Sequence, residues 1–312
     1  MGLLSKFIGR ESEANKCANE IAEKFTVASC SPSDCESCSV SEKYPASLSI
    51  DTETPLWGTV KAFGTHLLCA TGKTDWVHSV TDEKGTLAYA LDNNSKKWKL
   101  NADAKYQISN SSLSPPEEYF EHEGSDDTKP SRLLILPKFV YIDNVTPQTV
   151  ADNIKPVLSA FDAAEKPTDQ TIPELSKSLL SNIELPADSI AKVIASNDLA
   201  YVLLCSHRTR DKRCAVTANI LKKKFDSELQ GLDLYRDPSD DRPGGVKVLC
   251  ISHVGGHKYA ANVIIYTKSG QAIWLARVRP DHVRKIIQHC ILKGEVFPEL
   301  LRAAFNSNPI SW

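Results

Sequence analysis

Short apolar runs alternate with amphipathic stretches through the second half of the chain. Four of these runs have the length of buried strands, at residues 199–205, 246–251, 261–266 and 272–278. Apolar residues near helical spacing after Cys214 predict a helix between the first two strands, and Pro280 begins another helix. A last helix is expected at 298–305. The order strand-helix-strand-strand-strand-helix suits an α/β unit with a thioredoxin-like sheet.

The first half carries a weaker pattern of the same kind. Strands are predicted at 58–63, 66–70, 86–90 and 132–141, and a helix is predicted at 149–160. Residues 110–130 are rich in Ser, Pro and acidic residues, so we expect an exposed loop there. Residues 1 to about 45 are polar, and three prolines between 166 and 197 indicate a connection between domains.

The two halves resemble each other at two points. Leu-Leu-Cys ends at both Cys69 and Cys205, and a strand leads into a proline-started helix at both Pro147 and Pro280. The two spacings, 136 and 133 residues, nearly agree, which predicts a tandem duplication of one α/β unit. We therefore expect an N-terminal polar segment, a degenerate thioredoxin-like domain, a linker and a second thioredoxin-like domain, at residues 1–45, 46–165, 166–197 and 198–312.

Composition places the chain among ordinary globular proteins. It has 312 residues and a net charge of −2, which provides no general attraction for nucleic acid or membranes. No apolar run approaches the ~20 residues of a membrane helix. Nine cysteines without a secretory signal indicate a reducing compartment. We expect a cytoplasmic location, with the nucleus as a second compartment.

The candidate chemistry lies in two pairs of residues, Cys205-x8-Cys214 and His253-x3-His257. Two thiolates and two imidazoles suit either a structural zinc ion or a [2Fe–2S] cluster with one histidine-ligated iron. The spacing alone leaves both open, although x8 is long for a zinc knuckle. His207 is expected near the site without being a ligand.

Histidine ligands would change the chemistry of such a cluster. Replacing two thiolates by neutral imidazoles removes two negative charges, so the centre accepts an electron more readily. Histidine-ligated Rieske centres span ~−150 to +300 mV, against ~−400 mV for plant-type ferredoxins. Because imidazole has a second nitrogen that can bind a proton, we expect one-electron transfer coupled to protonation.

The flanking residues carry a family resemblance. Cys205-Ser-His-Arg-Thr-Arg-Asp-Lys-Arg-Cys214, with Ser252-His253-Val-Gly-Gly-His257-Lys-Tyr-Ala-Ala-Asn262-Val, resembles the sucrase/ferredoxin-like family of thioredoxin-like ferredoxins, and most of all its fungal branch. That branch is described as holding a bis-histidinyl, non-Rieske [2Fe–2S] cluster. The resemblance implies four ligands: Cys205, Cys214, His253 and His257.

The resemblance also implies a function. The second half would be a ferredoxin domain of a cytosolic electron carrier rather than an enzyme, reduced by a flavin- or iron–sulfur-containing reductase. The first half aligns Cys69 with Cys205 and His78 with Cys214, but it has no H-x3-H pair, so no cluster is expected there. The alternative is a non-redox scaffold module with a structural Cys2His2 zinc site, linked to actin organisation.

Four basic residues crowd the ligand loop: Arg208, Arg210, Lys212 and Arg213. They predict either a solvated charge run or a positive field that favours the reduced cluster and steers an acidic reductase. Asp211 is expected to orient one of the arginines. Lys258 and Asn262 follow the second histidine and are candidate donors to the ligands.

The remaining cysteines have mostly structural interpretations. Cys250 and Cys290 fall on apolar faces and are predicted in the core. The run Cys30-x4-Cys35-x2-Cys38 predicts reduced loop thiols, with a second metal site as the alternative. The terminal residues Ile310, Ser311 and Trp312 resemble a signal read by the cytosolic iron–sulfur targeting machinery.

Overall fold

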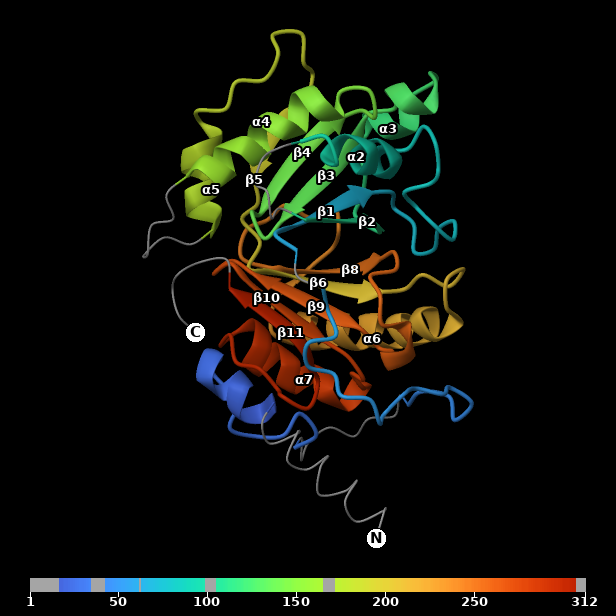
Figure 1. The fold of residues 1–312 in the computed structure, drawn as a ribbon, viewed down its shortest axis with the longest axis vertical. Helices are drawn as coiled ribbons and strands as arrows, with labels where there is room; N and C mark the ends of the chain where they lie inside the picture. The colour runs from blue at the N-terminus through green and yellow to red at the C-terminus, as the bar shows by residue number, and fades with distance from the viewer. Residues whose placement is uncertain (1–16, 35–42, 62, 99–104, 165–171, 307–312) are drawn as a thin grey trace.

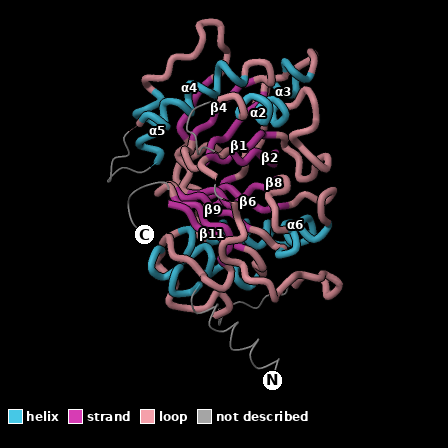
Figure 2. Tube along the Cα trace, viewed as in Figure 1, coloured by secondary structure: helices cyan, strands magenta, loops and turns pink. Residues whose placement is uncertain are grey.

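The fold is α/β, with a mixed sheet that runs through both halves of the chain (Figures 1 and 2). The computed structural model describes residues 17–34, 43–61, 63–98, 105–164 and 172–306. Its 11 strands are hydrogen-bonded in the order β11-β10-β9-β6-β8-β2-β1-β3-β4-β5, and β7 pairs with β8. A helix at residues 17–24 precedes the sheet.

The first half supplies five strands and the helices that cover one face of them. Its strands are β1 (Thr65–Ala70), β2 (Tyr106–Ser111), β3 (Ser131–Leu136), β4 (Val140–Val145) and β5 (Lys192–Ala195). Its helical elements are α2 (Leu87–Ser95), α3 (Glu118–Glu121), η1 (Asp126–Thr128), α4 (Val150–Ala163) and α5 (Ile172–Leu180). The segment predicted as a connection thus contains α5 and β5, and β5 extends the sheet by pairing with β4.

The second half supplies six strands. They are β6 (Ala200–Cys205), β7 (Tyr235–Arg236), β8 (Val246–Ile251), β9 (Val263–Thr267), β10 (Gln271–Leu275) and β11 (Leu301–Asn306). Its helical elements are α6 (Lys212–Gly231), η2 (His257–Tyr259), η3 (Pro280–His282), α7 (Val283–Lys285) and the π-helical turn η4 (Ile286–Ile291).

The halves repeat one pairing pattern. β1 is parallel to β2 and antiparallel to β3, which pairs with β4; β6 is parallel to β8 and antiparallel to β9, which pairs with β10. A helix, α2 or α6, connects the two parallel strands each time. The halves join where Ser111 of β2 faces Ile251 of β8. Across this joint, Asn110 and Ser252 exchange hydrogen bonds of 2.9 and 3.0 Å.

Three apolar clusters show how the layers are stacked. One lies between the first-half strands and α2 and α4, and another lies between the second-half strands and α6 and α7. The third contains Leu68 and Leu134 of the first half together with Leu249 and Trp274 of the second. The inner faces of the two half-sheets therefore pack on each other, with the helices outside (Figure 1).

Several predictions were wrong. The strand predicted at 132–141 is two antiparallel strands, β3 and β4, with a turn between them, and residues 110–116 of the predicted exposed loop are mostly buried. Residues 86–90 begin the helix α2, because Thr86 is an N-cap whose hydroxyl accepts from the Tyr89 amide at 3.3 Å. Residues 298–305 form no helix but contain most of β11, which pairs with β10 and completes the sheet. The described part of 58–63 contains no strand, and its Gly58 amide donates to the Arg302 carbonyl at 2.9 Å.

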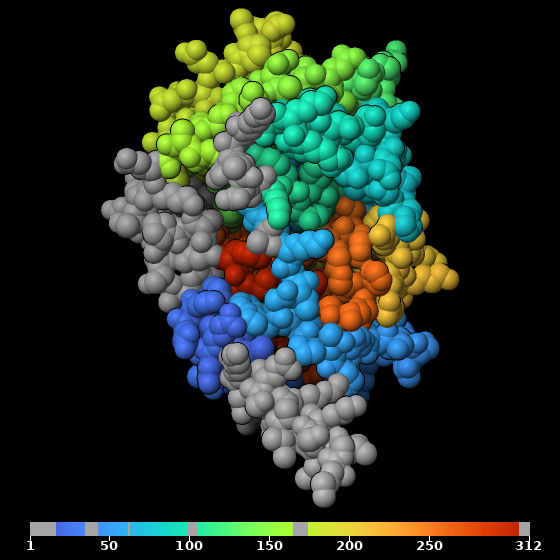
Figure 3. Space-filling model, viewed as in Figure 1, coloured from blue at the N-terminus to red at the C-terminus, as the bar shows by residue number. Residues whose placement is uncertain are grey.

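Residues 43–61 pass over the second half of the chain before β1 begins. The Tyr44 hydroxyl donates to the Val278 carbonyl at 2.7 Å, and the Arg277 side chain donates to the Asp51 carbonyl at 2.6 Å. In Figure 3 this light-blue segment runs across the orange and red residues of the second half. Within the described residues, no helix is long and apolar enough to cross a membrane.

Candidate functional site

The four candidate ligands meet at the ends of the second-half strands. Cys205 ends β6 and Cys214 lies in the first turn of α6, where both thiols are buried. His253 follows β8, and His257 begins η2. The parallel pairing of β6 with β8 brings these ends to one edge, so the sheet itself assembles the site.

The four side chains touch in series. Cys205 lies close enough to Cys214 and to His253 for both to shift the pKa of its thiol. The His253 Nε2 and His257 Nδ1 atoms are 3.5 Å apart, and the two ring centroids are separated by 5.1 Å. The interaction with Cys214, and after it the one with His253, holds the pKa of Cys205 well below its usual value, while the interaction with Cys205 raises the pKa of Cys214. Burial lowers the pKa of His257.

The four side chains contact one another in pairs and do not surround a single point. Among the described residues, no group of three or more His, Cys, Asp or Glu side chains is placed to hold a single metal ion. The His253 Nδ1 atom is buried and has no hydrogen-bond partner. A buried polar atom without a partner is unfavourable unless something binds it. Two thiols and two imidazoles, one of which has this unpartnered nitrogen, form a donor set that would suit a cluster with two protein ligands on each iron.

His207 holds the loop at His253, as expected for a residue near the site. Its Nδ1 accepts from the His253 amide at 3.1 Å, and its Nε2 lies 3.1 Å from the Trp76 carbonyl oxygen. Accepting at one nitrogen and donating at the other requires the neutral ring with its proton on Nε2. His207 is therefore a brace between the two halves of the chain.

Arg302 holds the same loop next to His257, a role that sequence reasoning missed. This buried side chain donates to the Gly255 carbonyl at 3.3 Å and to the Asn262 Oδ1 at 2.9 Å. Asn262 in turn donates to the Gly256 carbonyl at 2.9 Å. Burial lowers the pKa of Arg302, while the nearby Cys205 thiolate favours its charge. Gly256 has a φ of 73°, and an added Cβ would lie 2.5 Å from the guanidinium.

The charged residues around the loops are divided between pairing and exposure. Asp211 caps α6 and binds the Arg213 side chain at 2.7 Å, so it orients an arginine as predicted. Lys258 pairs with Asp51 at 3.4 Å instead of donating to the ligands. Arg208, Arg210 and Lys212 are exposed.

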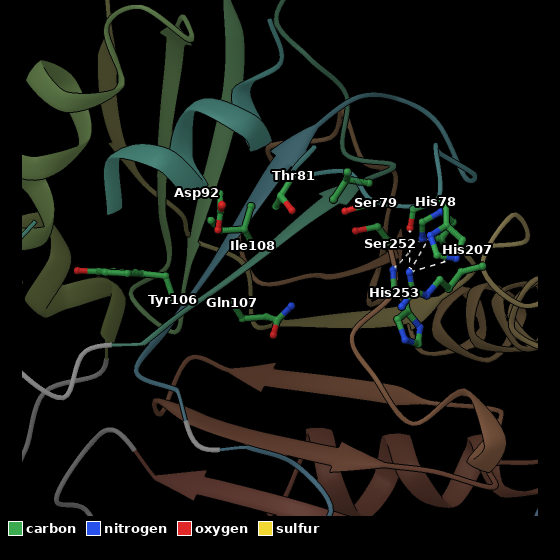
Figure 4. Close-up of a pocket in the computed structure, with 12 residues that line it drawn as sticks. His78, Ser79, Thr81, Asp92, Tyr106, Gln107, Ile108, His207, Ser252 and His253 are labelled. Atoms are coloured by element: carbon green, nitrogen blue, oxygen red, sulfur yellow. Dashed lines mark hydrogen bonds between the residues drawn. The ribbon is translucent and has the colours of Figure 1, made fainter. Parts of the chain in front are cut away.

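A first-half loop covers the ligand loop from the other side. Asp75 accepts from the Thr209 amide at 3.0 Å, and the Ser206 hydroxyl donates to the Thr74 carbonyl at 2.7 Å. Beside these contacts lies a cavity of about 290 Å³ that both halves line. Figure 4 shows His253, His207 and His78 gathered at one end of it, with Tyr106 at the other. The cavity therefore leads from solvent to the histidine side of the site.

The other predicted cysteines and histidine lie elsewhere. Cys69, Cys250 and Cys290 are buried, which confirms the core prediction for the last two. His78, which the repeat aligns with Cys214, contacts the Arg210 guanidinium at 2.9 Å. The Cys30 sulfur lies 3.4 Å from the His289 ring. Outside the described residues lie Cys35, Cys38, Ile310, Ser311 and Trp312.

Comparisons with known proteins agree with the motif. Residues 56–303 match the family described as sucrase/ferredoxin-like. Actin patches distal protein 1 of Saccharomyces cerevisiae is 35% identical over 266 residues, which is 82% of this chain and 79% of that protein. Altered inheritance of mitochondria protein 32 is 34% identical over 105 residues in Meyerozyma guilliermondii and 37% identical over 103 residues in Debaryomyces hansenii. Each of these two matches covers about a third of both chains.

No solved structure matches the chain. The family match spans most of the sequence, and it includes both cysteines and both histidines of the site. The chain therefore belongs to the sucrase/ferredoxin-like family.

Proposed function

We propose that this protein is an electron-transfer protein whose Cys205, Cys214, His253 and His257 hold one [2Fe–2S] cluster. The observation that carries the proposal is the serial contact of two buried thiols with two imidazoles, beside the unpartnered His253 Nδ1. When bound, such a cluster accepts and releases one electron. A four-coordinate zinc ion would instead need the donors around a single point.

The surrounding residues support this role through position and charge. His207 and Asn262 hold the loop of His253 and His257 at its two ends, so the imidazoles keep their orientation. Arg302 places a buried positive charge near Cys205. This charge would stabilise the negative charge that the site gains on reduction. Imidazole ligands bring a second ring nitrogen to the site, and we propose that reduction is coupled to protonation there.

The wider assignment rests on topology and surface charge. The same strand pairing with a connecting helix occurs in both halves, which supports two tandem thioredoxin-like units with the cluster in the second. Exposed Arg208, Arg210 and Lys212 suit the acidic surface of a flavin- or iron–sulfur-containing reductase. We propose a cytoplasmic protein whose terminal Ile310, Ser311 and Trp312 are read by the cytosolic iron–sulfur targeting machinery.

A pair of cysteine variants tests the proposal. The anaerobically purified protein should show visible charge-transfer absorption, and Cys205→Ser should lose it. Cys250→Ser is the matched control, because Cys250 is equally buried on the neighbouring strand but lies outside the ligand set. Equal absorption in the two variants would contradict the assignment.

A second candidate is a non-redox scaffold with a structural zinc ion. The relative that matches most of the chain is named for actin patches, and this name favours a link to actin organisation. A colourless protein that holds one zinc ion per chain and binds actin-patch proteins would support this alternative.

A further inference from the structure

A second group of reactive side chains lies away from the four-ligand site. The Cys30 Sγ atom is 3.4 Å from the His289 Nε2 atom, and the His289 Nδ1 atom is 2.5 Å from the Glu295 carboxylate. Cys30 and Glu295 are partly exposed, and His289 is buried. A nucleophile, a base and a carboxylate that orients the base stand in the order required for an activated thiol.

Backbone contacts hold these residues together across the length of the chain. Val27 and Val296 form a parallel bridge, and the Ala28 amide donates to the Val296 carbonyl at 3.0 Å. The Glu295 amide donates to the His289 carbonyl at 2.9 Å, next to the π-helical turn η4. The Phe297 ring packs edge-on against His289 at 5.5 Å. The imidazole is therefore held by Glu295 at Nδ1 and by the Phe297 ring, and it faces Cys30 with Nε2.

The other described cysteines outside the four-ligand site differ from Cys30. Burial raises the pKa of the thiols of Cys69, Cys250 and Cys290, so these thiols are poor nucleophiles. Cys17 is partly exposed, as Cys30 is, but no imidazole contacts it. Cys30 alone among these five combines access from solvent with a histidine.

We propose that Cys30, His289 and Glu295 form a second reactive site, in which His289 activates the Cys30 thiol to attack low-molecular-weight disulfides. The thiol proton moves to His289 Nε2, while Nδ1–H remains hydrogen-bonded to the carboxylate. The sulfur then forms a bond with one sulfur of the disulfide, and the other sulfur leaves as a thiolate. The product is a mixed disulfide on Cys30, and no further oxidant is needed.

Charged and titratable groups near Cys30 come from the segment around η4, from the loop of Cys30 itself and from the turn at η3. From η4 and the segment after it come His289 and Glu295. The loop itself carries Asp34, which accepts from the Ser31 amide. From the turn at η3, Arg279 donates to the Ser33 hydroxyl at 3.1 Å, beside His282 and Asp281. Of these groups only His289 contacts the sulfur, so the reactivity should follow this one residue.

The test measures the modification rate of each cysteine in the full chain. Oxidised glutathione is the probe, at pH 6, where an ordinary thiol is almost fully protonated. Cys35→Ser and Cys38→Ser are introduced so that Cys30 is the single thiol of its tryptic peptide. Cys30 should form the adduct about tenfold faster than Cys17, because only Cys30 has an imidazole placed to take its proton.

Two variants separate activation from folding. His289→Asn should reduce the Cys30 rate at pH 6 to that of Cys17, and Glu295→Gln should reduce it partially with an unchanged thermal midpoint. An unchanged rate in His289→Asn, or equal rates at Cys30 and Cys17, would overturn the proposal. Cys205→Ser should leave the Cys30 rate intact, so this site and the cluster can fail separately.

Discussion

Replacing Gly256 by alanine should disturb the loop between His253 and His257 far more than the same change at Gly255. Both glycines have left-handed backbones, with φ of 73° and 86°. A side chain in this region costs about 1–2 kcal/mol at either position. A Cβ at Gly255 meets nothing within 4 Å, whereas a Cβ at Gly256 would meet the Arg302 guanidinium at 2.5 Å.

The guanidinium cannot move aside freely, although it ends a flexible side chain. It is buried and donates to Gly255, Asn262 and Thr59, with contacts between 2.9 and 3.3 Å. Losing one such charged hydrogen bond costs about 1.5–3 kcal/mol. Gly256→Ala should therefore lower the free energy of unfolding by about 3–5 kcal/mol, and Gly255→Ala by about 1–2 kcal/mol.

Urea unfolding followed by circular dichroism measures both variants. Visible absorption of the same samples reports whether the histidine loop still binds its group. A double variant with Arg302→Ala removes the clash, so the difference between the two alanine substitutions should disappear in that background. Equal losses of stability for Gly255→Ala and Gly256→Ala in the native background would refute the proposed role of Arg302.

Three further outcomes are expected. His207→Phe should leave the His253 amide and the Trp76 carbonyl without a partner. Each of these two groups should then lower the free energy of unfolding by about 1–3 kcal/mol, which urea unfolding measures. Burial lowers the pKa of His66 to about 3, so the free energy of unfolding should fall as pH drops from 6.5 towards 3. The fall should be steeper than in His66→Gln by about 1.4 kcal/mol per pH unit, and equal slopes of unfolding free energy against pH in the two proteins would contradict this. His257→Cys should shift the reduction potential towards ~−400 mV and weaken its pH dependence, as measured by redox titration.

Much of the site could be predicted because its ligands end or follow strands with clear apolar patterns. Cys205 closes the run at 199–205, and His253 follows the run at 246–251, so parallel pairing was enough to bring them together. Arg302 gave no comparable signal, since its role depends on a contact with Gly255, 47 residues earlier in the chain. Its one sign is a lone arginine in an apolar run, where the sequence predicts a helix.

One error in the fold also comes from a long-range contact. Residues 298–305 have good helix formers, yet β10 offers a free edge, and pairing there overrides local propensity. At 86–90 the sequence did contain the answer, because Thr86 precedes Leu87 and Leu91 at helical spacing. The contact between Cys30 and His289 spans 259 positions, so no local pattern could reveal it.

The content of iron and acid-labile sulfide, with electron paramagnetic resonance of the reduced protein, tests the central claim most directly. Anaerobically purified protein should contain about two iron and two sulfide ions per chain, as a [2Fe–2S] cluster requires. Reduction by one electron should give a paramagnetic signal that is absent from Cys214→Ser. A colourless protein with one zinc ion per chain and no sulfide would contradict the claim.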